Sequence, residues 1–319
     1  MKTTTPENIL GIACDWLDHG RRIALATVVE TWGSAPRRSG AQMVVDADGV
    51  MMGSVSGGCV EGAVIIAAQD AIAEGRARLL TYGVSDHDAF AVGLACGGDI
   101  TVLVEPVGAV MPKAQVQQLR DAVAARKNAA YRTTLHSQDS RVVTGAHARG
   151  LQTGLSDDKV EVTVAFEPTL RLVIVGAVHI AQSLAPMAQL SGFEIVVIDP
   201  RPDFAHDVRF DGSRIMDAWP DDALNALGLD KLTAVVTLTH DPKLDDPAIL
   251  TALGTDVMYL GCLGSKRTHA KRLDRLRLAG VDQSGLDRIK GPVGLDIGAA
   301  SPSEIAVSIL AQVIQQFRI

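Results

Sequence analysis

The stretch that most constrains the fold is residues 171–201, where an apolar run, a helical pattern and a second apolar run follow one another. Residues 172–175 form a short apolar run that ends at Gly176, which is typical of a buried parallel strand. Residues 179–190 carry apolar side chains at helical spacing, and residues 195–198 form a second apolar run. This order predicts a βαβ unit, so we expect a Rossmann-like parallel sheet in the C-terminal half.

The turn of this unit departs from the dinucleotide-binding fingerprint at one position. In the pattern G-x-G-x-x-G/A, the chain supplies Gly176, Val178 and Ala181. Val178 replaces the glycine that lets a pyrophosphate approach the backbone, so ordinary tight NAD binding is disfavoured, although the helix N-terminus still attracts anions. After the second strand, Asp199 is placed to accept a hydrogen bond from a ribose 2′-hydroxyl, and Arg201 is placed to bind a 2′-phosphate instead.

Length and composition set the class of protein. The chain has 319 residues, which favours two domains, and we expect them at residues 1–167 and 168–319. It is 47% hydrophobic and has a formal net charge of −7, which suits α/β cores and argues against nucleic acid as a main partner. The first residues lack the apolar segment of a signal peptide, and no apolar run is long enough to span a bilayer. We therefore expect a cytoplasmic protein that does not bind membranes.

The N-terminal domain is expected to be a mixed α+β domain. Helices are expected at residues 6–19, with Thr5 as the N-cap, at 60–74 and at 112–125, and strands at 22–30, 42–45, 79–82 and 100–104. Residues 131–167 alternate loosely between polar and apolar side chains, so we expect edge strands there.

The C-terminal domain continues after the βαβ unit with further strands and helices. Strands are expected at residues 234–238 and 257–260, and helices at 222–227, 267–279 and from residue 302 onward. The last helix is preceded by Ser301-Pro302-Ser303-Glu304, which is a capping box with proline at the first helical position. Residues 201–230 are otherwise polar and are expected to be mostly loop.

Three loops of the N-terminal domain share a composition rich in glycine and serine. They are TWGSAPRRSG at residues 31–40, GSVSGG at 53–58 and GLACGGD at 93–99. Backbone amides that are unobstructed by side chains cradle oxyanions, and the adjacent Arg37 and Arg38 suit a phosphate. The alternative interpretation is that the glycines only make tight turns.

The cysteines are a second candidate for chemistry. None of the four belongs to a C-x-x-C pair, so we expect free thiols. Cys59 immediately precedes a predicted helix, where a thiolate is favoured, and the nearby Glu61 is either a base or a helix cap. Cys14 is expected in the core of the first helix. Cys59, Cys96 and Cys262 are interpreted either as functional thiols or as small buried apolar residues.

Polar residues of the C-terminal domain follow strands that end at the ligand-binding edge of an open α/β sheet. His240 and Asp241 follow one such strand, and Ser265 and Lys266 follow another. These side chains either contact a ligand or brace the loops that carry them.

The candidate cofactor-binding residues are Arg37, Arg38, Ser56, Gly57, Gly58, Cys59, Glu61, Cys96, Gly97, Gly98, Gly176, His179, Asp199, Arg201, His240, Asp241, Gly264, Ser265 and Lys266. The sequence contains no G-x-S-x-G elbow, P-loop or H-E-x-x-H motif, and its histidines are not clustered as a His-based metal site would require. It is therefore more typical of a protein that holds an anionic ligand than of one that turns over a substrate.

Six motifs from both halves of the chain carry a family resemblance. They are GSAPRRSGA (33–41), GSVSGGCVEGAV (53–64), LACGGDI (94–100), LTHD (238–241), GCLGSKR (261–267) and GPVGLDIGAASPSEIAVSI (291–309). In this order they resemble the XdhC/CoxI family of maturation chaperones for molybdenum hydroxylases, over nearly the whole chain. The chain departs from the family at Val178, where members usually read GAGHVA.

The resemblance implies a cytoplasmic chaperone for an enzyme such as xanthine dehydrogenase or an aldehyde oxidoreductase. It implies binding of molybdenum cofactor, as molybdopterin or its cytosine dinucleotide form, and delivery of that cofactor to the apo-enzyme. It also implies support for sulfuration by a cysteine desulfurase, with a cofactor cytidylyltransferase as a further expected partner. Glycine-rich loops and a Rossmann turn suit the phosphates of this cofactor, and a soft Cys59 thiolate suits contact with molybdenum or carriage of sulfur.

Two other classes of function stay open at this point. The βαβ unit alone would also suit an NAD(P)-dependent oxidoreductase, for which His240 is the one candidate acid–base residue. A scaffold that joins the desulfurase and the client enzyme without holding cofactor is the other alternative. A homodimer is the expected assembly, because homodimers are the commonest oligomers.

Overall fold

The structure is a computed structural model that describes residues 8–35, 37–83, 98–135, 137, 139–201 and 209–318. The chain divides into two compact units, of which one ends at Pro168 and the other begins at Thr169. Each unit has its own sheets and its own cores. None of the helices within the described residues is both long enough and apolar enough to cross a membrane.

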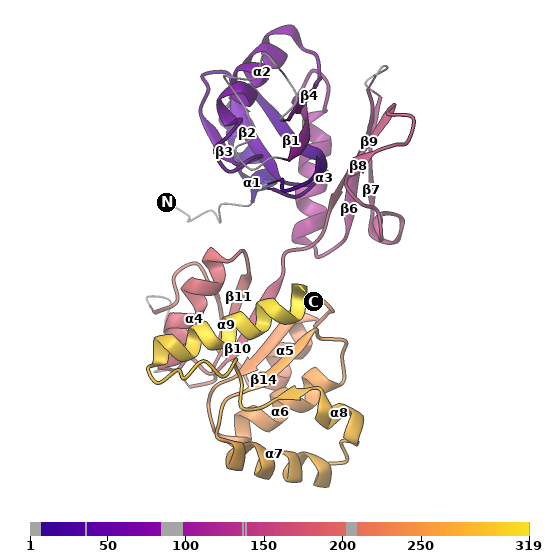
Figure 1. The fold of residues 1–319 in the computed structure, drawn as a ribbon. Helices are drawn as coiled ribbons and strands as arrows, with labels where there is room; N and C mark the ends of the chain where they lie inside the picture. The colour runs from indigo at the N-terminus through magenta and orange to yellow at the C-terminus, as the bar shows by residue number, and fades with distance from the viewer. Residues whose placement is uncertain are drawn as a thin grey trace. The chain divides into compact units, whose positions relative to one another are not determined.

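A five-stranded antiparallel sheet forms the centre of the N-terminal unit (Figure 1). Its strands in spatial order are β3 (Met51–Gly53), β2 (Gln42–Asp46), β1 (Ile23–Trp32), β5 (Asp99–Pro106) and β4 (Arg78–Tyr82). The strands predicted from the sequence are confirmed. The first seven residues of β1 are buried because helices or a second sheet cover both faces of this central strand.

Helices cover both faces of this sheet and are α1 (Ile9–Asp18), α2 (Glu61–Glu74) and α3 (Lys113–Ala124). The helix α2 packs on one face, and α1 and α3 share a core with the other face. The helix α1 has Asn8 as its N-cap, and the Asn8 side chain accepts a hydrogen bond of 3.0 Å from the Gly11 amide. The predicted cap, Thr5, lies outside the described residues.

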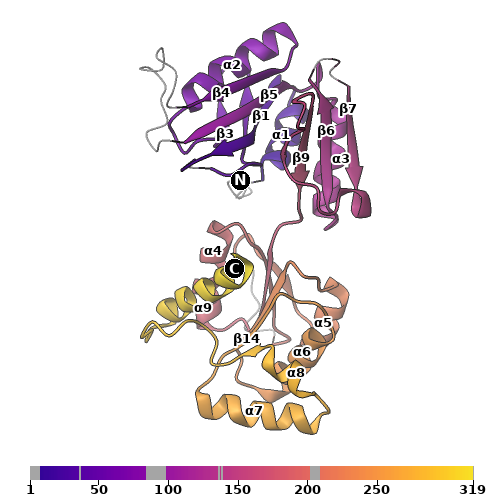
Figure 2. The same cartoon turned by 45° about the vertical axis from the view of Figure 1, so that its right-hand side comes forward.

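A second antiparallel sheet is formed by the segment that was expected to supply edge strands. Its strands in spatial order are β7 (Ser140–Thr144), β6 (Ala129–Thr134), β9 (Glu161–Phe166) and β8 (Gly154–Leu155), and the 3-10 helix η2 (Gly145–Ala148) follows β7. The expectation of edge strands is confirmed for β7 and β8, which lie at the two edges of this sheet, and is wrong for β6 and β9, which lie between them. The sheet lies beside α3 (Figure 2). Its apolar face, which includes Tyr131 and Val164, packs into the core that α1 and α3 share.

A six-stranded parallel sheet forms the centre of the C-terminal unit. Its strands in spatial order are β12 (Arg214–Met216), β11 (Glu194–Ile198), β10 (Arg171–Val175), β13 (Thr233–Thr237), β14 (Tyr259–Cys262) and β15 (Ile289–Lys290). Counted along this unit, the order is 3-2-1-4-5-6, which is the order of the dinucleotide-binding fold. The predicted Rossmann-like parallel sheet is confirmed.

Helices cover both faces of the parallel sheet (Figures 1 and 2). One face carries α4 (His179–Leu190) and α9 (Pro302–Arg318), and the other carries α5 (Pro220–Leu227), α6 (Pro242–Leu253), α7 (Lys266–Leu278) and α8 (Gln283–Asp287). The predicted capping box of α9 is confirmed, since the Glu304 carboxylate accepts hydrogen bonds from the Ser301 and Ala300 amides at 2.8 and 2.9 Å.

Several short elements of the C-terminal unit were not predicted. They are β12, α8 and β15, together with the longer helix α6. The strand β12 lies inside the segment expected to be loop, and three residues are too few to show a period. The helix α6 begins at Pro242 and contains Pro247, which obscures its helical pattern.

Candidate functional site

The strands that adjoin the three glycine-rich loops of the N-terminal unit end or begin at one edge of its five-stranded sheet. Opposite Trp32, where β1 ends, lies Asp99, where β5 begins. Gly53, at the end of β3, pairs with Met43 near the start of β2. Tyr82, where β4 ends, pairs with Ile100 of β5. The strand ends that flank the three loops therefore lie at the same edge of the sheet.

The first and third loops contact each other through Gly98. A Cβ atom at Gly98 would lie 2.6 Å from the Trp32 carbonyl oxygen and 2.7 Å from the Ala35 amide nitrogen. Only glycine allows this approach of two backbones. The predicted site residues Cys96 and Gly97 lie outside the described residues.

Glu61 organises the second loop. Its Oε1 atom accepts hydrogen bonds from the Ser54 hydroxyl at 2.6 Å, the Ser56 amide at 2.9 Å and the Val55 amide at 3.2 Å. Its Oε2 atom accepts from the Gly58 amide at 2.8 Å and from the Ser56 hydroxyl. The carboxylate therefore fixes nearly every residue of the loop that precedes its own helix.

These contacts decide between the two interpretations of Glu61. Burial alone would raise the pKa of Glu61, but the hydrogen bonds from Ser54, Ser56 and the loop amides outweigh burial and lower the pKa to about 2. A carboxylate that is ionised at neutral pH and whose oxygens are both occupied is a poor proton acceptor. Glu61 is a structural residue that closes the loop onto the helix start.

The start of α2 offers backbone donors beside a thiol. The N-cap residue, Val60, has no side chain that caps the helix. The amides of Gly62 and Ala63, and that of Cys59, have no hydrogen-bond partner among the described residues. Such groups at a helix N-terminus bind anions. Cys59 is half-buried and lies two residues before the helix, which begins one residue later than predicted.

The space beside this helix start is open. Gly57 and Gly58 are exposed, have φ angles of 77° and 116°, and would meet nothing within 4 Å if they carried a Cβ atom. Their amides are not free, since Gly57 donates to the Ser54 hydroxyl at 2.8 Å and Gly58 donates to Glu61. These glycines therefore provide access to the donors of Cys59 and Gly62 and do not cradle an anion themselves.

The two arginines of the first loop differ in exposure. Arg37 is half-buried, whereas Arg38 is exposed and its guanidinium has no hydrogen bond or ion pair with a described residue. The Arg38 carbonyl accepts a hydrogen bond of 3.1 Å from the Ala41 amide, which closes the loop. Arg38 is thus the cation at this edge that is best placed to reach an anionic ligand.

A buried carboxylate also organises the turn of the Rossmann unit. Asp199 is completely buried, and its Oδ2 atom accepts hydrogen bonds from the Ala177 amide at 2.8 Å and from Arg201 Nη2 at 2.7 Å. Its Oδ1 atom accepts from Arg201 Nε at 2.8 Å and from the Arg201 amide at 3.1 Å. Burial acts to raise the pKa of Asp199, but the bonds from Arg201 and Ala177 hold it below its ordinary value.

This pairing changes the expected roles of the two residues. Asp199 and Arg201 bind each other in this conformation, so both Asp199 oxygens already accept hydrogen bonds and a ribose hydroxyl would compete with Arg201 for them. The close approach of Gly176 is explained by packing, because a Cβ atom there would lie 2.6 Å from Thr239 Cγ2. Val178 is the N-cap of α4, and the exposed His179 is its first residue.

The remaining predicted residues of the C-terminal unit lie at the carboxyl ends of β13 and β14. His240 is exposed and has a φ of 60°, and Asp241 is the N-cap of α6, accepting from the Lys243 amide at 3.0 Å. Ser265 is the N-cap of α7 and accepts from the Thr268 amide at 3.1 Å. The loop-bracing interpretation therefore holds for Asp241 and Ser265.

Two further predicted cofactor-binding residues, Gly264 and Lys266, lie at the same edge. Gly264 has a φ of 140°, and Lys266, the first residue of α7, is exposed. Together with His240 and His179, Lys266 is free to face solvent at the edge where ligands of open α/β sheets bind.

Two of the cysteines are inaccessible. Cys14 is buried in α1, as expected. Cys262 is completely buried at the end of β14, and burial raises the pKa of its thiol to about 11. Cys262 is thus a neutral core residue rather than an edge-of-pocket thiol. Among the described residues, no three His, Cys, Asp or Glu side chains gather as metal ligands would.

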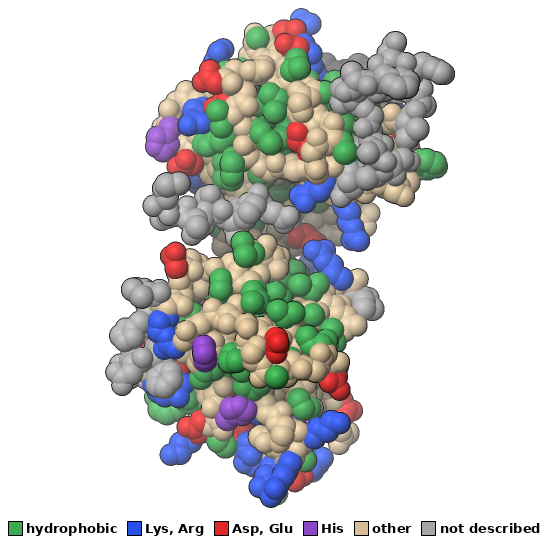
Figure 3. All heavy atoms as spheres, turned by 60° about the vertical axis from the view of Figure 1, so that its left-hand side comes forward, with side chains coloured by type: hydrophobic (Ala, Val, Ile, Leu, Met, Phe, Trp, Pro, Cys, Tyr) green, Lys and Arg blue, Asp and Glu red, His purple; other side chains and the backbone are tan. Residues whose placement is uncertain are grey.

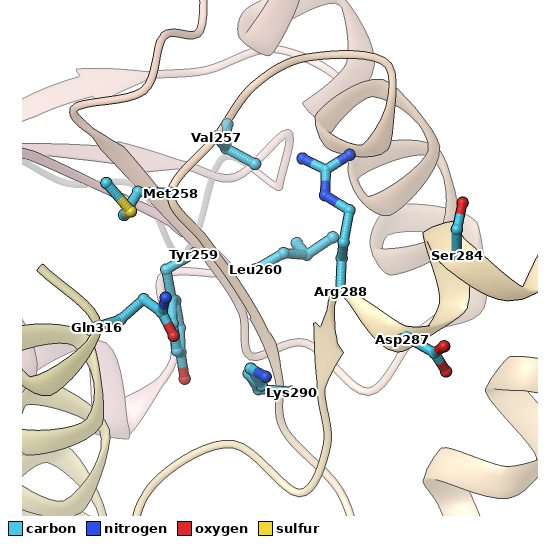
Figure 4. A pocket seen from close by; sticks show the side chains of 9 residues that line it. All are labelled: Val257, Met258, Tyr259, Leu260, Ser284, Asp287, Arg288, Lys290 and Gln316. Carbon is cyan, nitrogen blue, oxygen red and sulfur yellow. The ribbon is translucent and has the colours of Figure 1, made fainter. Parts of the chain in front are cut away.

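A shallow pocket lies at the opposite end of β14, beside α8 and α9 (Figure 4). One of its two cations, Arg288, extends toward Val257 and donates hydrogen bonds to the Leu253 and Thr255 carbonyls at 2.8 and 2.7 Å. Another lining residue, Tyr259, donates to Gln312 at 2.5 Å. The chain itself uses these polar groups, and none of the predicted site residues lines the pocket.

The α4 and α9 side of the C-terminal unit exposes hydrophobic side chains (Figure 3). Leu190 at the end of α4, and Val307 and Ile314 on α9, are exposed although the opposite face of α9 is buried. Single exposed apolar residues are common on protein surfaces, so these residues do not define a site.

Sequence reasoning missed Ser54 and the buried pair Asp245 and Arg272. The Ser54 hydroxyl bonds Glu61 and the Gly57 amide, and the spacing of Ser54 and Ser56 before Glu61 was a usable signal for this loop. Asp245 and Arg272 come from two different helices, and nothing in the sequence pairs them.

Comparison with known proteins covers both units. Residues 172–313 match the family model described as the XdhC Rossmann domain, and residues 16–83 match the model described as the XdhC and CoxI family. The chain is 32% identical over 316 residues to the molybdenum cofactor insertion chaperone PaoD of Escherichia coli, covering 98% of this chain and 88% of PaoD. It is 29% identical over 322 residues to a probable xanthine dehydrogenase subunit of Bacillus subtilis, covering 94% of each.

A solved structure is also similar over the whole chain. It is the crystal structure of a protein described as a xanthine dehydrogenase from Bacillus halodurans, with a TM-score of 0.80 and 27% sequence identity. The match covers 99% of this chain and 96% of that one.

Proposed function

This chain belongs to the XdhC and CoxI family, and from that premise we propose that it holds molybdenum cofactor and delivers it to an apo molybdenum hydroxylase. The client we propose is an enzyme of the xanthine dehydrogenase or aldehyde oxidoreductase type. The name of PaoD supports the role in cofactor insertion, and the name of the Bacillus subtilis relative supports the class of client.

One observation carries the proposal for the site: unpaired backbone donors and a half-buried thiol lie together at the open start of α2. Cys59 supplies the thiol and one amide, and Gly62 and Ala63 supply two further amides. A phosphate of the cofactor fits these donors, because uncapped amides at a helix N-terminus bind phosphates. The soft sulfur of Cys59 fits molybdenum or a sulfur atom in transit. Bound cofactor would supply the molybdenum centre of the client.

The finer parts of the proposal concern form and partners. We propose that the cofactor is bound as molybdopterin or its cytosine dinucleotide form, with Arg38 as an exposed cation of the first loop. We further propose that a cysteine desulfurase sulfurates the held cofactor, and that a cofactor cytidylyltransferase supplies the dinucleotide form. In the Rossmann unit, His179, His240 and Lys266 are the exposed residues for a nucleotide at the carboxyl edge of the sheet.

Titration of the apo-protein with molybdenum cofactor in both forms tests the site, with NADPH and CTP titrated alongside. We expect saturable cofactor binding that weakens about tenfold or more in Cys59→Ala, because the sulfur contact is lost. The free energy of unfolding should change by less than about 0.5 kcal/mol, since Cys59 is only half-buried and has no side-chain partner among the described residues. Cys14→Ala, which removes a buried thiol of the same unit, is the matched control and should leave binding intact.

Three other results would contradict the proposal. Full cofactor binding and full client activation by Cys59→Ala would remove Cys59 from the site. Tight NADPH binding without cofactor binding would favour an oxidoreductase. A protein that binds both desulfurase and client but no cofactor would be a scaffold.

A further inference from the structure

Two charged residues are buried beneath the carboxyl edge of the Rossmann sheet. Asp245 on α6 is 1% exposed, and Arg272 on α7 is 2% exposed. Arg272 Nη2 lies 3.6 Å from Asp245 Oδ2, so the two form an ion pair but no hydrogen bond. Charges are rarely buried to this degree unless they are paired and held by further contacts.

Each member of this pair holds one turn at the sheet edge. Arg272 Nη2 donates a hydrogen bond of 2.8 Å to the carbonyl of Leu263, which begins the turn that contains Gly264 and Ser265. Asp245 Oδ1 accepts a hydrogen bond of 2.6 Å from the Thr239 hydroxyl. The buried pair thus lies between the turn after β13 and the turn after β14.

Thr239 extends the connection in two directions. Its hydroxyl oxygen accepts a hydrogen bond of 3.1 Å from the Asp241 amide, so it fixes the turn that carries His240 in its left-handed conformation. Its methyl group packs against Gly176 in the turn after β10. Three of the turns at the carboxyl edge are therefore in contact with one buried network.

Stability alone is a poor explanation for this pair. Arg272 Nε and Nη1 and Asp245 Oδ2 have no hydrogen-bond partner in the described structure, and neither have the nearby Thr237 hydroxyl and His269 Nδ1. Unsatisfied buried polar groups are destabilising, and well-packed apolar residues often replace a buried ion pair without loss of stability. A role for the pair in fixing the turns accounts for its presence.

We propose that Asp245 and Arg272 are positioning residues that couple the Thr239–Asp241 turn to the Leu263–Lys266 turn. The two turns then form one rigid edge of the sheet, to which a phosphate-bearing ligand binds. The coupling is a property of the free protein. The identity of the ligand rests on the proposed function, because a dinucleotide form of the cofactor would bring such phosphates.

The same two helices provide a matched control. Arg275 on α7 pairs with Asp246 on α6, with Arg275 Nε 2.7 Å from Asp246 Oδ2 and Nη2 2.9 Å from Oδ1. This pair is partly exposed, and the other hydrogen bond of the Arg275 guanidinium goes to the Lys271 carbonyl within α7. Arg275→Met therefore removes an ion pair between α6 and α7 without touching the proposed coupling.

Amide hydrogen exchange of the full-length protein tests the coupling without a ligand. In Arg272→Met, the Asp241 amide, which is on the far side of the pair, should exchange about tenfold faster or more. In Asp245→Asn, the Leu263 and Thr268 amides should respond in the same way. Arg275→Met should change neither turn. If each substitution affects only the turn that it contacts directly, the turns are not coupled and the proposal is wrong.

A double variant separates positioning from stability. Asp245→Val combined with Arg272→Met replaces the buried pair with apolar side chains of similar total volume, which should restore the midpoint of chemical unfolding. Exchange in both turns should nevertheless stay fast. Exchange that returns to wild-type rates together with stability would show a merely structural role and overturn the proposal. This variant also serves if either single variant fails to fold.

CTP binding tests the ligand part separately. In a titration of wild-type protein with CTP, Arg272→Met should weaken binding about tenfold and Arg275→Met should not. Equal binding by all three proteins would exclude the pair from ligand recognition. If wild-type protein does not bind CTP, the nucleotide part of the proposed function fails, and the exchange experiment still decides the coupling.

Discussion

The loop before α2 and the turns of the Rossmann sheet both depend on buried carboxylates, but they gather their partners in opposite ways. Glu61 takes its hydrogen bonds from residues 54–58, directly before it in the chain. Asp199 takes three from Arg201 and one from Ala177, 22 residues away, and Asp245 faces Arg272 on another helix. The first arrangement is wholly local, whereas the second also depends on contacts between distant parts of the unit.

This difference shows what each edge is suited to. A loop closed by its own helix has a shape that depends on few other residues. Under the proposed coupling, a turn held by α6 and α7 should respond to a change in how those helices pack. The N-terminal edge is thus suited to a fixed set of donors, and the C-terminal edge is suited to transmitting a change between turns.

Removing the Glu61 carboxylate should have the largest effect on stability. In Glu61→Ala, the amides of Val55, Ser56 and Gly58 lose their acceptor, so the free energy of unfolding should fall by about 4 kcal/mol. Chemical denaturation measures the loss, and hydrogen exchange should place it in residues 54–60. Glu74→Ala, an exposed carboxylate at the other end of the same helix, should change little.

The pH dependence of Glu61 gives an independent check. Because its pKa is lowered from 4.5 to about 2 in the folded state, its stabilisation is present above pH 4.5 and is lost as the pH falls toward 2. Glu61→Gln should remove this part of the acid sensitivity. An unchanged acid profile in Glu61→Gln would show that the carboxylate is not the organiser.

A buried carboxyl group that accepts its hydrogen bonds from side-chain hydroxyls sharpens the comparison. Glu105 on β5 is buried and accepts a hydrogen bond of 2.7 Å from the Tyr131 hydroxyl. Burial raises its pKa from 4.5 to about 7, despite the lowering effect of the bonds from Tyr131 and Thr133. The neutral acid is thus the form that the fold favours, which is the reverse of Glu61.

The sign of the pH effect is therefore also reversed. The contribution of Glu105 is fully present below pH 4.5 and is lost as the pH rises through 7, at a cost of about 3 kcal/mol. Glu105→Gln should not show this loss, so the difference in unfolding free energy between variant and wild type should grow in favour of the variant from pH 4.5 to 8. A difference that stays constant with pH would contradict the assignment.

The smallest of the three effects is expected at the Rossmann turn. In Asp199→Ala, the Ala177 amide and the Arg201 guanidinium lose their partner, which should cost about 2 kcal/mol. Hydrogen exchange should show faster exchange at the Ala177 amide, while the loop before α2 stays protected. Asp274→Ala, which removes an exposed pairing with Arg277, should leave both regions unchanged.

Local patterns explain what could be predicted from the sequence. The strands and helix of the βαβ unit follow from apolar spacing, and the capping box of α9 follows from four adjacent residues. The shared edge of the three N-terminal loops could not be predicted, because it follows from antiparallel pairing between distant strands. The separate four-stranded sheet was missed for the same reason, because the alternation of polar and apolar side chains along a strand does not reveal which strand it pairs with.

The site shows the same division. Cys59 before a helix could be predicted from adjacent residues and is found there. The mutual pairing of Asp199 and Arg201 was not anticipated, because the fingerprint gives positions at a turn and not the bonds that the side chains make with each other. Asp245 and Arg272 had no signal at all, because each is an ordinary charged residue in its own helix.

The loop that Glu61 closes has one more consequence, for the release of whatever binds beside it. The loop is ordered without a bound ligand, because the Glu61 carboxylate accepts the hydrogen bonds of amides that would otherwise need a bound anion. Binding of a ligand beside this loop should therefore cost little conformational entropy, and release of the ligand should leave the loop ordered. A carrier that is equally ordered when loaded and when empty can pass its cargo onward without unfolding any part of itself.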